Sequence, residues 1–505
     1  ARRPRRGARR REWQAGTRGS AAARRLITAA SRPWWTLAGA CAGLFVLMLD
    51  STVVALALPQ IHRELGASPT GLQWVMNGYL LVIAVLVVTA GRLGDIFGRK
   101  RVFLFGMVVF AAGSVVSATA GTEEALIAGR AIQGAGAAAM LSLSLALVCN
   151  AFPAAAQARA LGIWAGVSAV ALAVGPLAGG ALIELDWRLI FWINLPLCAA
   201  GLAITAIAAP ESTDPGASRH VDFPGLVTLT LGVGALVLAL VQSRVWQGPE
   251  TAAVAAFGVL MLAAFWAIEQ RAAEPIVEFS LFRNGPYFGA SAAAFALVGA
   301  YWVVMFFQPQ YLQDVQGHSA IEAGVLILPV TAPMIFISPY SGRLIARFGA
   351  RALMTTGMAL GVLGLLVLTR IDAGTSYGLL LAGYLLFGIA LGFVYAPMST
   401  AAMAAMPPEK VGIAAGVLAM DRVLAGAIGL AATGAVFHAL QVGGDSFADA
   451  VAGSAWVPAG LCALGTALTW AFVRDPEPPG PDPSVAGDPE PAELRHHQHH
   501  RRFHL

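Results

Sequence analysis

Two oppositely charged residues lie deep in apolar runs of the first third of the chain, where they could exchange a proton. Asp50 follows Leu49 inside a long hydrophobic stretch. A lone carboxylate in hydrocarbon is costly, so it must face the interior of a bundle or a cavity. Burial favours the protonated form of a carboxyl group, whereas a neighbouring cation favours the carboxylate. Asp50 is therefore predicted to load and release a proton, and the alternative is a structural, hydrogen-bonded acid.

Arg130 is the predicted partner of this acid. The apolar segments that carry Asp50 and Arg130 are expected to run in opposite directions through the membrane. Both residues then lie roughly 9–12 Å below the same surface, at a helical rise of about 1.5 Å per residue. A direct or water-mediated pair follows, either as part of proton transfer or as a static ion pair.

A glycine-rich polar stretch between the second and third apolar segments contains a further acid and base. Asp95 and Arg99 are four residues apart, so they can pair with each other or cap a helix end. Gly91 and Gly94 permit close approach of the backbone, and Gly98 precedes the basic residues. Positive charge at a membrane surface explains the basic residues alone, but it does not explain the spacing of the glycines and the acid.

Small residues and a proline interrupt the fifth apolar segment at Gly175, Pro176, Gly179 and Gly180. Small residues let helices pack closely in lipid, and proline removes a backbone donor. Helix packing and a functional bend are both compatible with this pattern.

A second pair of charges, Asp421 and Arg422, lies in the middle of the thirteenth apolar segment. Asp421 either neutralises Arg422 or forms a second proton or cation site. The aromatic and Met residues that could line an apolar substrate pocket are Trp74, Tyr79, Tyr301, Trp302, Met305, Phe306 and Tyr395. The four cysteines lie in apolar runs without a CxxC spacing, so no metal site is predicted.

Composition requires that these residues be positioned by membrane helices. The chain of 505 residues is 57% hydrophobic and 12% charged, with a mean hydropathy of +0.69, whereas soluble domains carry about 25% charged residues. A spanning helix needs about 20 mostly apolar residues. Fourteen such segments are predicted, at 34–58, 70–90, 102–120, 125–149, 159–183, 188–209, 223–242, 251–268, 287–309, 323–342, 352–369, 377–397, 411–437 and 455–473.

The distribution of basic residues predicts the orientation. Twelve Lys and Arg residues fall in the loops on one side of the fourteen segments and four on the other, and residues 1–32 add eleven arginines to the richer side. Loops rich in Lys and Arg stay in the cytoplasm. Both termini are therefore predicted to be cytoplasmic.

An internal repeat predicts the architecture. The sequence GRL···FG followed by a basic residue occurs at 91–100 and again at 342–351, after the second and the tenth segment. Two six-helix halves with an inserted central pair of helices account for this spacing. The predicted regions are an Arg-rich disordered arm (1–33), the first half (34–209), the inserted pair with its flanking loops (210–285), the second half (286–473) and a disordered tail (474–505).

These motifs resemble the major facilitator superfamily, in particular its fourteen-helix drug:proton antiporter branch. The stretch 91–101, GRLGDIFGRKR, resembles the signature between the second and third helices. The stretch 49–59 resembles the first-helix motif, with Ala55 where Asn is usual, and 130–136 resembles the fourth-helix motif. The stretch 175–180 resembles the fifth-helix antiporter motif, with Ala171 replacing its leading Gly.

The resemblance implies an all-α integral membrane protein with the major facilitator fold. It implies that Arg130 takes part in proton transfer and that Gly91, Asp95, Gly98 and Arg99 belong to a latch that governs switching between conformations. It also implies that the glycines of 175–180 bend the fifth helix and favour exchange over uniport.

The predicted function is proton-coupled export of amphipathic or cationic small molecules. The alternatives are a narrow carrier of one metabolite or of a self-made antibiotic, and a membrane sensor that transports nothing. No phosphate-binding GxxxxGK[ST] loop, nucleophile elbow or HExxH motif occurs, so no enzyme is predicted. The expected partners are a small-molecule substrate, protons and membrane lipid, but not nucleic acid. The protein is expected to work as a monomer without a cofactor and to use a proton gradient as its energy source. The abundance of Arg over Lys, together with Ala and Gly, favours a bacterial plasma membrane protein.

Overall fold

The computed structural model describes residues 28, 31–214, 216, 220–243, 245–246 and 248–474. Nearly all of the predicted arm at 1–33 and tail at 474–505 therefore lies outside the described residues. Every helix and turn discussed below belongs to the described part of the chain, in which no strand occurs.

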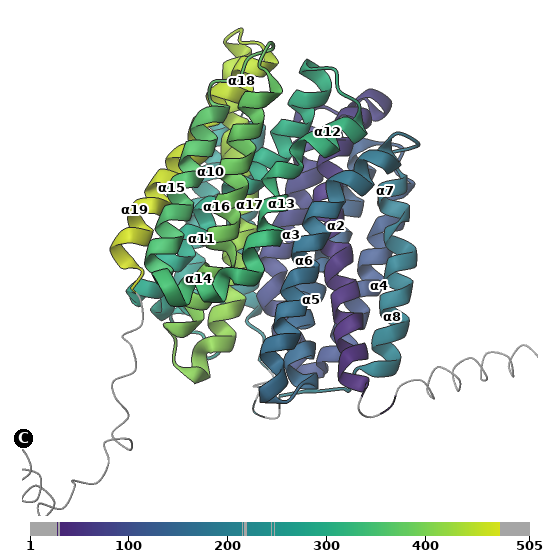
Figure 1. The fold of residues 1–505 in the computed structure, drawn as a ribbon, viewed down its shortest axis with the longest axis vertical. Helices are drawn as coiled ribbons and strands as arrows, with labels where there is room; N and C mark the ends of the chain where they lie inside the picture. Colours follow the sequence, from purple (N-terminus) through teal and green to yellow (C-terminus); the bar gives the residue numbers. More distant parts are fainter. Residues whose placement is uncertain are drawn as a thin grey trace, which may run out of the picture.

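The first half of the chain folds as one bundle on the right of Figure 1. Its helices are α2 (Arg32–Leu65), α3 (Pro69–Phe97), α4 (Arg99–Ala118), α5 (Glu123–Ala151), α6 (Ala154–Ile183), the short α7 (Leu189–Trp192) and α8 (Asn194–Ala208). The inserted pair is α9 (Phe223–Gln242) and α10 (Gly248–Glu269), of which α9 packs against α3 and α17.

Most of the second half lies on the left of Figure 1, in green and yellow. Its helices are α11 (Gly285–Gln310), α12 (Ala320–Ile327), α13 (Ala332–Ile337), α14 (Ser341–Phe348), α15 (Ala350–Leu368), α16 (Tyr377–Ala404), α17 (Val411–Val442), α18 (Phe447–Ser454) and α19 (Trp456–Phe472). Thirteen of the described helices are long and apolar enough to cross a membrane, and the bent pair 320–330 and 332–348 makes a fourteenth with an angle of 42°. The predicted all-α membrane architecture is confirmed, and the tenth span is broken at Pro329 and Pro333.

Two predicted helix ends were wrong. The helix α2 continues seven residues beyond the predicted boundary at 58 and ends where Gly66 adopts a φ of 64°, because polar residues alone do not stop a helix whereas a left-handed glycine does. The predicted loop at 91–100 is also mostly helical. Residues 91–97 complete α3, and Gly98, with a φ of 113°, forms the turn to α4.

The two ends of the bundle can be named by their loops. The arginine-rich end holds the turns at Gly98 and Gly349, and the acid-rich end, upper in Figure 1, holds α12 and α18. Figure 1 shows the two halves side by side along this axis. Their mutual contacts decide which end is closed.

The halves contact each other at the acid-rich end. The Gln313 amide donates to the carbonyl of Leu56 at 3.0 Å, and Arg63 pairs with Asp314 at 3.5 Å. Toward the arginine-rich end, by contrast, several glycines face open space. At Gly162 and Gly166 of α6, Gly342 of α14 and Gly412 of α17, no heavy atom of the described residues lies within 4 Å of where a Cβ would be.

Candidate functional site

Asp50 and Arg130 form a buried ion pair inside the first half. Asp50 lies midway along α2 and is 1% exposed, and Arg130 lies at the start of the third turn of α5 and is fully buried. Arg130 Nη1 is 2.5 Å from Asp50 Oδ2. The two predicted partners are therefore brought together, directly rather than through water.

Two further polar side chains complete the coordination of the carboxylate, and a third bonds to one of them. Asp50 Oδ1 accepts hydrogen bonds from Asn194 Nδ2 at 2.8 Å and from Gln133 Nε2 at 3.1 Å. Gln133 Nε2 also donates to Ser114 Oγ at 2.9 Å, and its Oε1 accepts from Arg130 Nη1 at 3.0 Å. All of these residues are fully buried, so the network is closed to solvent.

Arg130 is held in place by groups on α3. Its Nε donates to the carbonyl of Val75 at 3.2 Å, and its guanidinium lies 3.9 Å from the ring centroid of Tyr79. A cation over an aromatic face is stabilised by about 2 kcal/mol or more when both are desolvated. Tyr79 was predicted only as a pocket-lining residue, and its ring instead supports the ion pair.

Glycines at the crossing of α4 and α5 bring this network together. A Cβ on Gly113 would lie 2.5 Å from the backbone nitrogen of Gln133, and one on Gly136 would lie 2.4 Å from the carbonyl oxygen of Gly106. Only glycine permits this backbone approach. It places Ser114 of α4 within hydrogen-bonding distance of Gln133.

The network leaves a few polar atoms without a partner. Arg130 Nη2, Asn194 Oδ1 and the Tyr79 hydroxyl are buried and make no hydrogen bond. The carboxylate of Asp50, in contrast, has both oxygens engaged. Within the described part of the chain, every hydrogen bond to this carboxylate therefore comes from a donor on α5 or α8.

Sequence reasoning missed the roles of Gln133, Asn194 and Ser114. A usable signal was present, because an amide or hydroxyl in the middle of an apolar segment needs a buried partner. Gln133 also lies three residues after Arg130, which places both side chains on one face of α5.

The glycines of α6 lie against Asp50's own helix and against the second half. A Cβ on Gly175 would lie 1.9 Å from Thr52 Oγ1, and one on Gly179 would lie 2.7 Å from Val53 Cγ1. On the other face, a Cβ on Gly180 would lie 2.6 Å from the Cα of Ile321 in α12.

The contact between α6 and α12 is reciprocal. A Cβ on Gly324 of α12 would lie 2.3 Å from the carbonyl oxygen of Pro176. The stretch 175–180 is therefore part of the closed contact between the halves, one helix turn from Asp50.

The turn at Gly98 contains the predicted pair of Asp95 and Arg99. Arg99 Nε and Nη2 both lie 2.8 Å from Asp95 Oδ1. Gly94 approaches α5 closely, since its Cβ would lie 2.3 Å from Leu143 Cδ2. Gly91 does not, because a Cβ there would meet only Ser142 at 3.7 Å.

The segment that follows α8 is hydrogen-bonded to this turn. The Glu211 carboxylate accepts a hydrogen bond from the backbone N–H of Lys100 at 3.0 Å, and the Arg99 N–H donates to the carbonyl of Ser212 at 2.9 Å. Glu211 satisfies an N–H at the beginning of α4, where an anion is favoured. Glu211 was not among the predicted site residues, because it is far from Gly98 along the chain.

Asp421 and Arg422 are not brought to the Asp50 site, nor do they pair with each other. They lie on α17 of the second half, and within the described residues neither forms an ion pair. Arg422 lies 5.4 Å from the ring centroid of Tyr395 on α16, whereas Asp421 Oδ2 is buried without a hydrogen-bond partner. The two side chains form no direct ion pair, because adjacent helical residues point about 100° apart, and their charges interact only through space.

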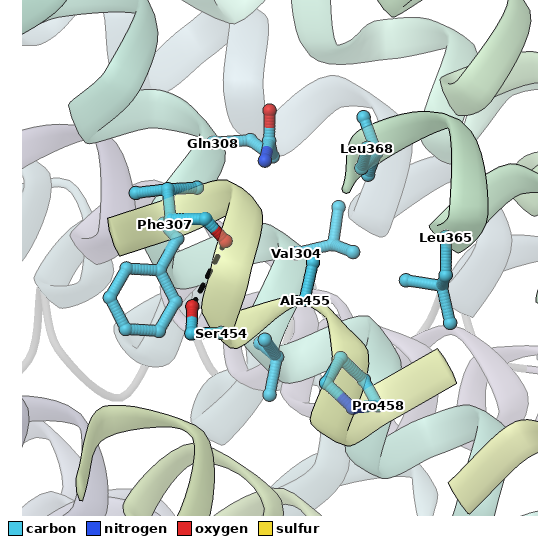
Figure 2. Close-up of a pocket in the computed structure, with 10 residues that line it drawn as sticks. Val304, Phe307, Gln308, Leu365, Leu368, Ser454, Ala455 and Pro458 are labelled. Carbon is cyan, nitrogen blue, oxygen red and sulfur yellow. Dashed lines mark hydrogen bonds between the residues drawn. The ribbon is translucent and has the colours of Figure 1, made fainter. Parts of the chain in front are cut away.

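A small cavity within the second half lies between α11, α15 and α18 (Figure 2). Val304, Phe307 and Leu365 line it, and the dashed line in Figure 2 marks a hydrogen bond of the Ser454 hydroxyl, which donates to the carbonyl of Val451 at 3.0 Å. Its volume of about 10 Å³ is close to that of one water probe. This cavity is a packing gap rather than a substrate site.

Comparison with known proteins matches residues 40–430 to the model of the Major Facilitator Superfamily. The multidrug resistance protein Stp of Mycobacterium tuberculosis is 36% identical over 80% of this chain and 76% of its own length. The tetracenomycin C resistance and export protein of Streptomyces glaucescens is 34% identical over 86% of this chain and 80% of its own length. The methylenomycin A resistance protein of Bacillus subtilis is 33% identical over 85% of this chain and 92% of its own length.

Solved structures share the fold at low identity. A D-xylose–proton symporter superposes with a TM-score of 0.64 at 15% identity, over 88% of this chain and 98% of its own. A human organic anion transporter superposes with a TM-score of 0.62 at 18% identity, over 86% and 99%. The arrangement of two helical halves is therefore that of known transporters.

Proposed function

Because this chain belongs to the Major Facilitator Superfamily, and is thus a multi-pass membrane transporter of small molecules rather than an enzyme, we propose that it exports drug-like or antibiotic molecules in exchange for protons. The relatives at 33–36% identity carry names of drug and antibiotic resistance proteins. The buried pair of Asp50 and Arg130 is the observation that carries the coupling to protons.

The pair supports a proton-exchange step at Asp50. In the arrangement described, Arg130 neutralises the carboxylate, and the amides of Gln133 and Asn194 stabilise its charge. Entry of a proton removes that charge and frees Arg130 from Asp50. Release of the proton restores the pair, so the protonation state of Asp50 selects between two arrangements of α2 and α5.

The contact between the halves links this step to access. Gly175 and Gly179 pack on α2 beside Asp50, and Gly180 packs on α12 of the second half. A shift of α2 on protonation is therefore transmitted to the closed acid-rich end through α6. Separation there, with closure at the arginine-rich end, would complete alternating access.

The proposed orientation follows from charge. We place the arginine-rich end and both termini in the cytoplasm of a bacterium, with the chain in the plasma membrane. The structure then represents the state closed to the outside. The protein is proposed to act as a monomer in lipid, with the proton gradient as its energy source and without a cofactor.

Inverted vesicles test the proposed exchange. Vesicles with an acidic interior, made from cells that express the full chain, are followed with a pH-sensitive dye while lipophilic drugs are added. The parent protein is expected to dissipate the gradient on addition of a substrate, and Asp50→Asn is expected to abolish this response. Asp445→Asn, an exposed acid outside the network, serves as the matched control and should respond like the parent. A full response of Asp50→Asn across a range of pH would refute proton exchange at this residue.

The same assay separates a broad exporter from a narrow one. Two of the relatives are named for a single antibiotic each, tetracenomycin C and methylenomycin A. A response to many unrelated drugs supports multidrug export, whereas a response to one antibiotic class alone supports the narrow carrier.

A further inference from the structure

A lateral pocket in the second half is separate from the Asp50 site and has no assigned role. Its walls come from α11, α17 and α19, with Phe282 contributed by the turn before α11, and none of its lining residues belongs to the first half. Its volume is about 250 Å³, near the lower limit of small-molecule pockets at about 300 Å³.

The pocket opens toward the surrounding bilayer rather than between the halves. Leu464 of α19 lines it and is 56% exposed in the middle of a spanning helix, where the exposed surface faces lipid. The helix α19 lies at the outer edge of the second half in Figure 1. A molecule dissolved in the membrane can therefore reach this pocket without passing through either aqueous compartment.

The pocket lies in the half of the membrane next to the arginine-rich end. Phe288 is three residues from the beginning of α11, and Leu468 is four residues from the end of α19. At about 1.5 Å per residue, these positions are roughly 5–6 Å from the helix ends, and Asp421 is about 15 Å from the beginning of α17. The pocket therefore extends from near the membrane surface to near its middle.

Its chemistry is apolar with one carboxylate. Apart from Ser291 and Asp421, the lining side chains are aromatic or aliphatic, or the residue is glycine. Asp421 Oδ2 is buried without a hydrogen-bond partner, and within the described residues no cation lies at ion-pair distance from this carboxylate. An acid in hydrocarbon normally pairs with a cation or faces water. Here the neighbouring Arg422 acts on the carboxylate only through space and forms no ion pair with it.

We propose that this pocket is a membrane-facing binding site for a lipophilic organic cation, with Asp421 as its counter-ion. The aromatic side chains of Phe282, Phe288 and Phe295 add apolar and cation–π contact for such a ligand. Binding of the cation at this site does not depend on the proposed function. Only the further step, in which the bound cation is a substrate taken from the membrane for export, rests on the proposed function.

The proposal is tested by binding alone. The full chain is placed in nanodiscs and its affinity for tetraphenylphosphonium is measured, with tetraphenylsilane as an uncharged probe of the same shape. All variants carry Asp50→Asn, so the measurement does not depend on proton coupling, and failure of the transport proposal leaves it unaffected.

Removal of the charge is the first comparison. Asp421→Asn is expected to weaken tetraphenylphosphonium binding at least tenfold and to leave tetraphenylsilane binding within twofold. Binding of the cation within twofold of the parent would overturn the proposal. Loss of a co-purified phospholipid, with cation binding intact, would overturn it in favour of a lipid site.

A steric pair keeps the test independent of the folding of Asp421→Asn. Leu464→Trp fills the mouth of the pocket and is expected to weaken cation binding at least tenfold. Ala467→Trp places the same side chain on an exposed position of α19 outside the pocket and should bind like the parent. Equal binding by the two tryptophan variants would show that the cation binds elsewhere.

Discussion

The two halves contain the same turn in different surroundings. Gly98 in the first half and Gly349 in the second both have a positive φ, of 113° and 81°, and both follow a helix that ends in Phe. The first turn is held by the Asp95–Arg99 pair and by Glu211. In the second, Ala346 stands where Asp95 stands in the first, and no residue of α14 is buried.

The buried acids of the two halves, Asp50 and Asp421, also differ in how many partners surround them. Asp50 accepts hydrogen bonds from side chains of α5 and α8, whereas Asp421 of the second half has a buried oxygen without a partner. A repeat therefore conserves backbone geometry, while single side chains decide what each half does. The first half contains a direct charge pair and a turn held by Glu211, whereas, among the described residues, the second half has a carboxylate without an ion pair and a turn on an unburied helix.

The largest expected effect comes from breaking the charge pair of the first half. Arg130→Ala leaves the Asp50 carboxylate buried and unpaired, which should lower the free energy of unfolding by about 3–5 kcal/mol and abolish export. Arg422→Ala of the second half removes the contact with Tyr395 and a through-space attraction to Asp421, and the loss of the ring contact should cost about 0.5–2 kcal/mol. Denaturation in detergent measures both.

A double variant distinguishes an unpaired charge from lost packing. Asp50→Asn combined with Arg130→Gln removes both charges and should recover part of the stability that Arg130→Ala loses, without restoring proton-coupled export. A double variant as unstable as Arg130→Ala would mean that shape, not charge, explains the loss.

A glycine-to-alanine substitution in α6 should disturb the contact between the halves at only one end of this helix. Gly180→Ala forces a Cβ against the backbone of α12, and such overpacking costs about 1–3 kcal/mol. It should favour separation at the acid-rich end, whereas Gly162→Ala meets open space and should have no effect. Spin labels at Leu185 and Val442, in a background without native cysteines, report the distance, and equal distributions for the two variants would contradict the assignment.

The two turns should differ modestly in their tolerance of a side chain. Gly98→Ala and Gly349→Ala both force a non-glycine residue into a positive φ, at a cost of about 1–3 kcal/mol each. Gly98→Ala also displaces Glu211 and its hydrogen bond to Lys100, which adds about 1 kcal/mol. Adding Glu211→Ala to each variant should narrow the difference in thermal midpoint, and an unchanged difference would remove Glu211 from the explanation.

The smallest expected effect comes from removing an ion pair at the arginine-rich end of the second half. Lys410 and the Ser280 hydroxyl, in that order, hold the pKa of Glu278 below its usual range. A lowered pKa stabilises the fold above the ordinary Glu pKa of about 4.3, and the gain is lost as the pH falls through the lowered value. Because the pair is partly exposed, Lys410→Gln should cost at most about 1 kcal/mol at pH 7. Its thermal midpoint should approach that of the parent in acid, and a constant difference at every pH would exclude the charge as the cause.

Much of the architecture could be predicted from the sequence, because membrane helices are dictated by local properties. A run of about 20 apolar residues must satisfy its own backbone hydrogen bonds, so the number of helices and their approximate positions follow from composition. The pairing of Asp50 with Arg130 could also be predicted. The helices that carry them cross the membrane in opposite directions, and counting residues from the helix ends places both charges at the same depth. Helix ends were less accessible, because α2 ends at Gly66 rather than where its apolar run stops.

Contacts between segments far apart in the chain were decided only by the tertiary structure. Asn194 reaches Asp50 from α8, Glu211 reaches the beginning of α4, and Gly180 meets Ile321 across the two halves. Each contact depends on helix rotation and on close approach between backbones, which a linear pattern of apolar residues does not specify. The sequence by itself determined which charges must be buried, because the bilayer penalises every one of them. Packing alone decided that Asp50 is fully coordinated and that Asp421 faces a pocket.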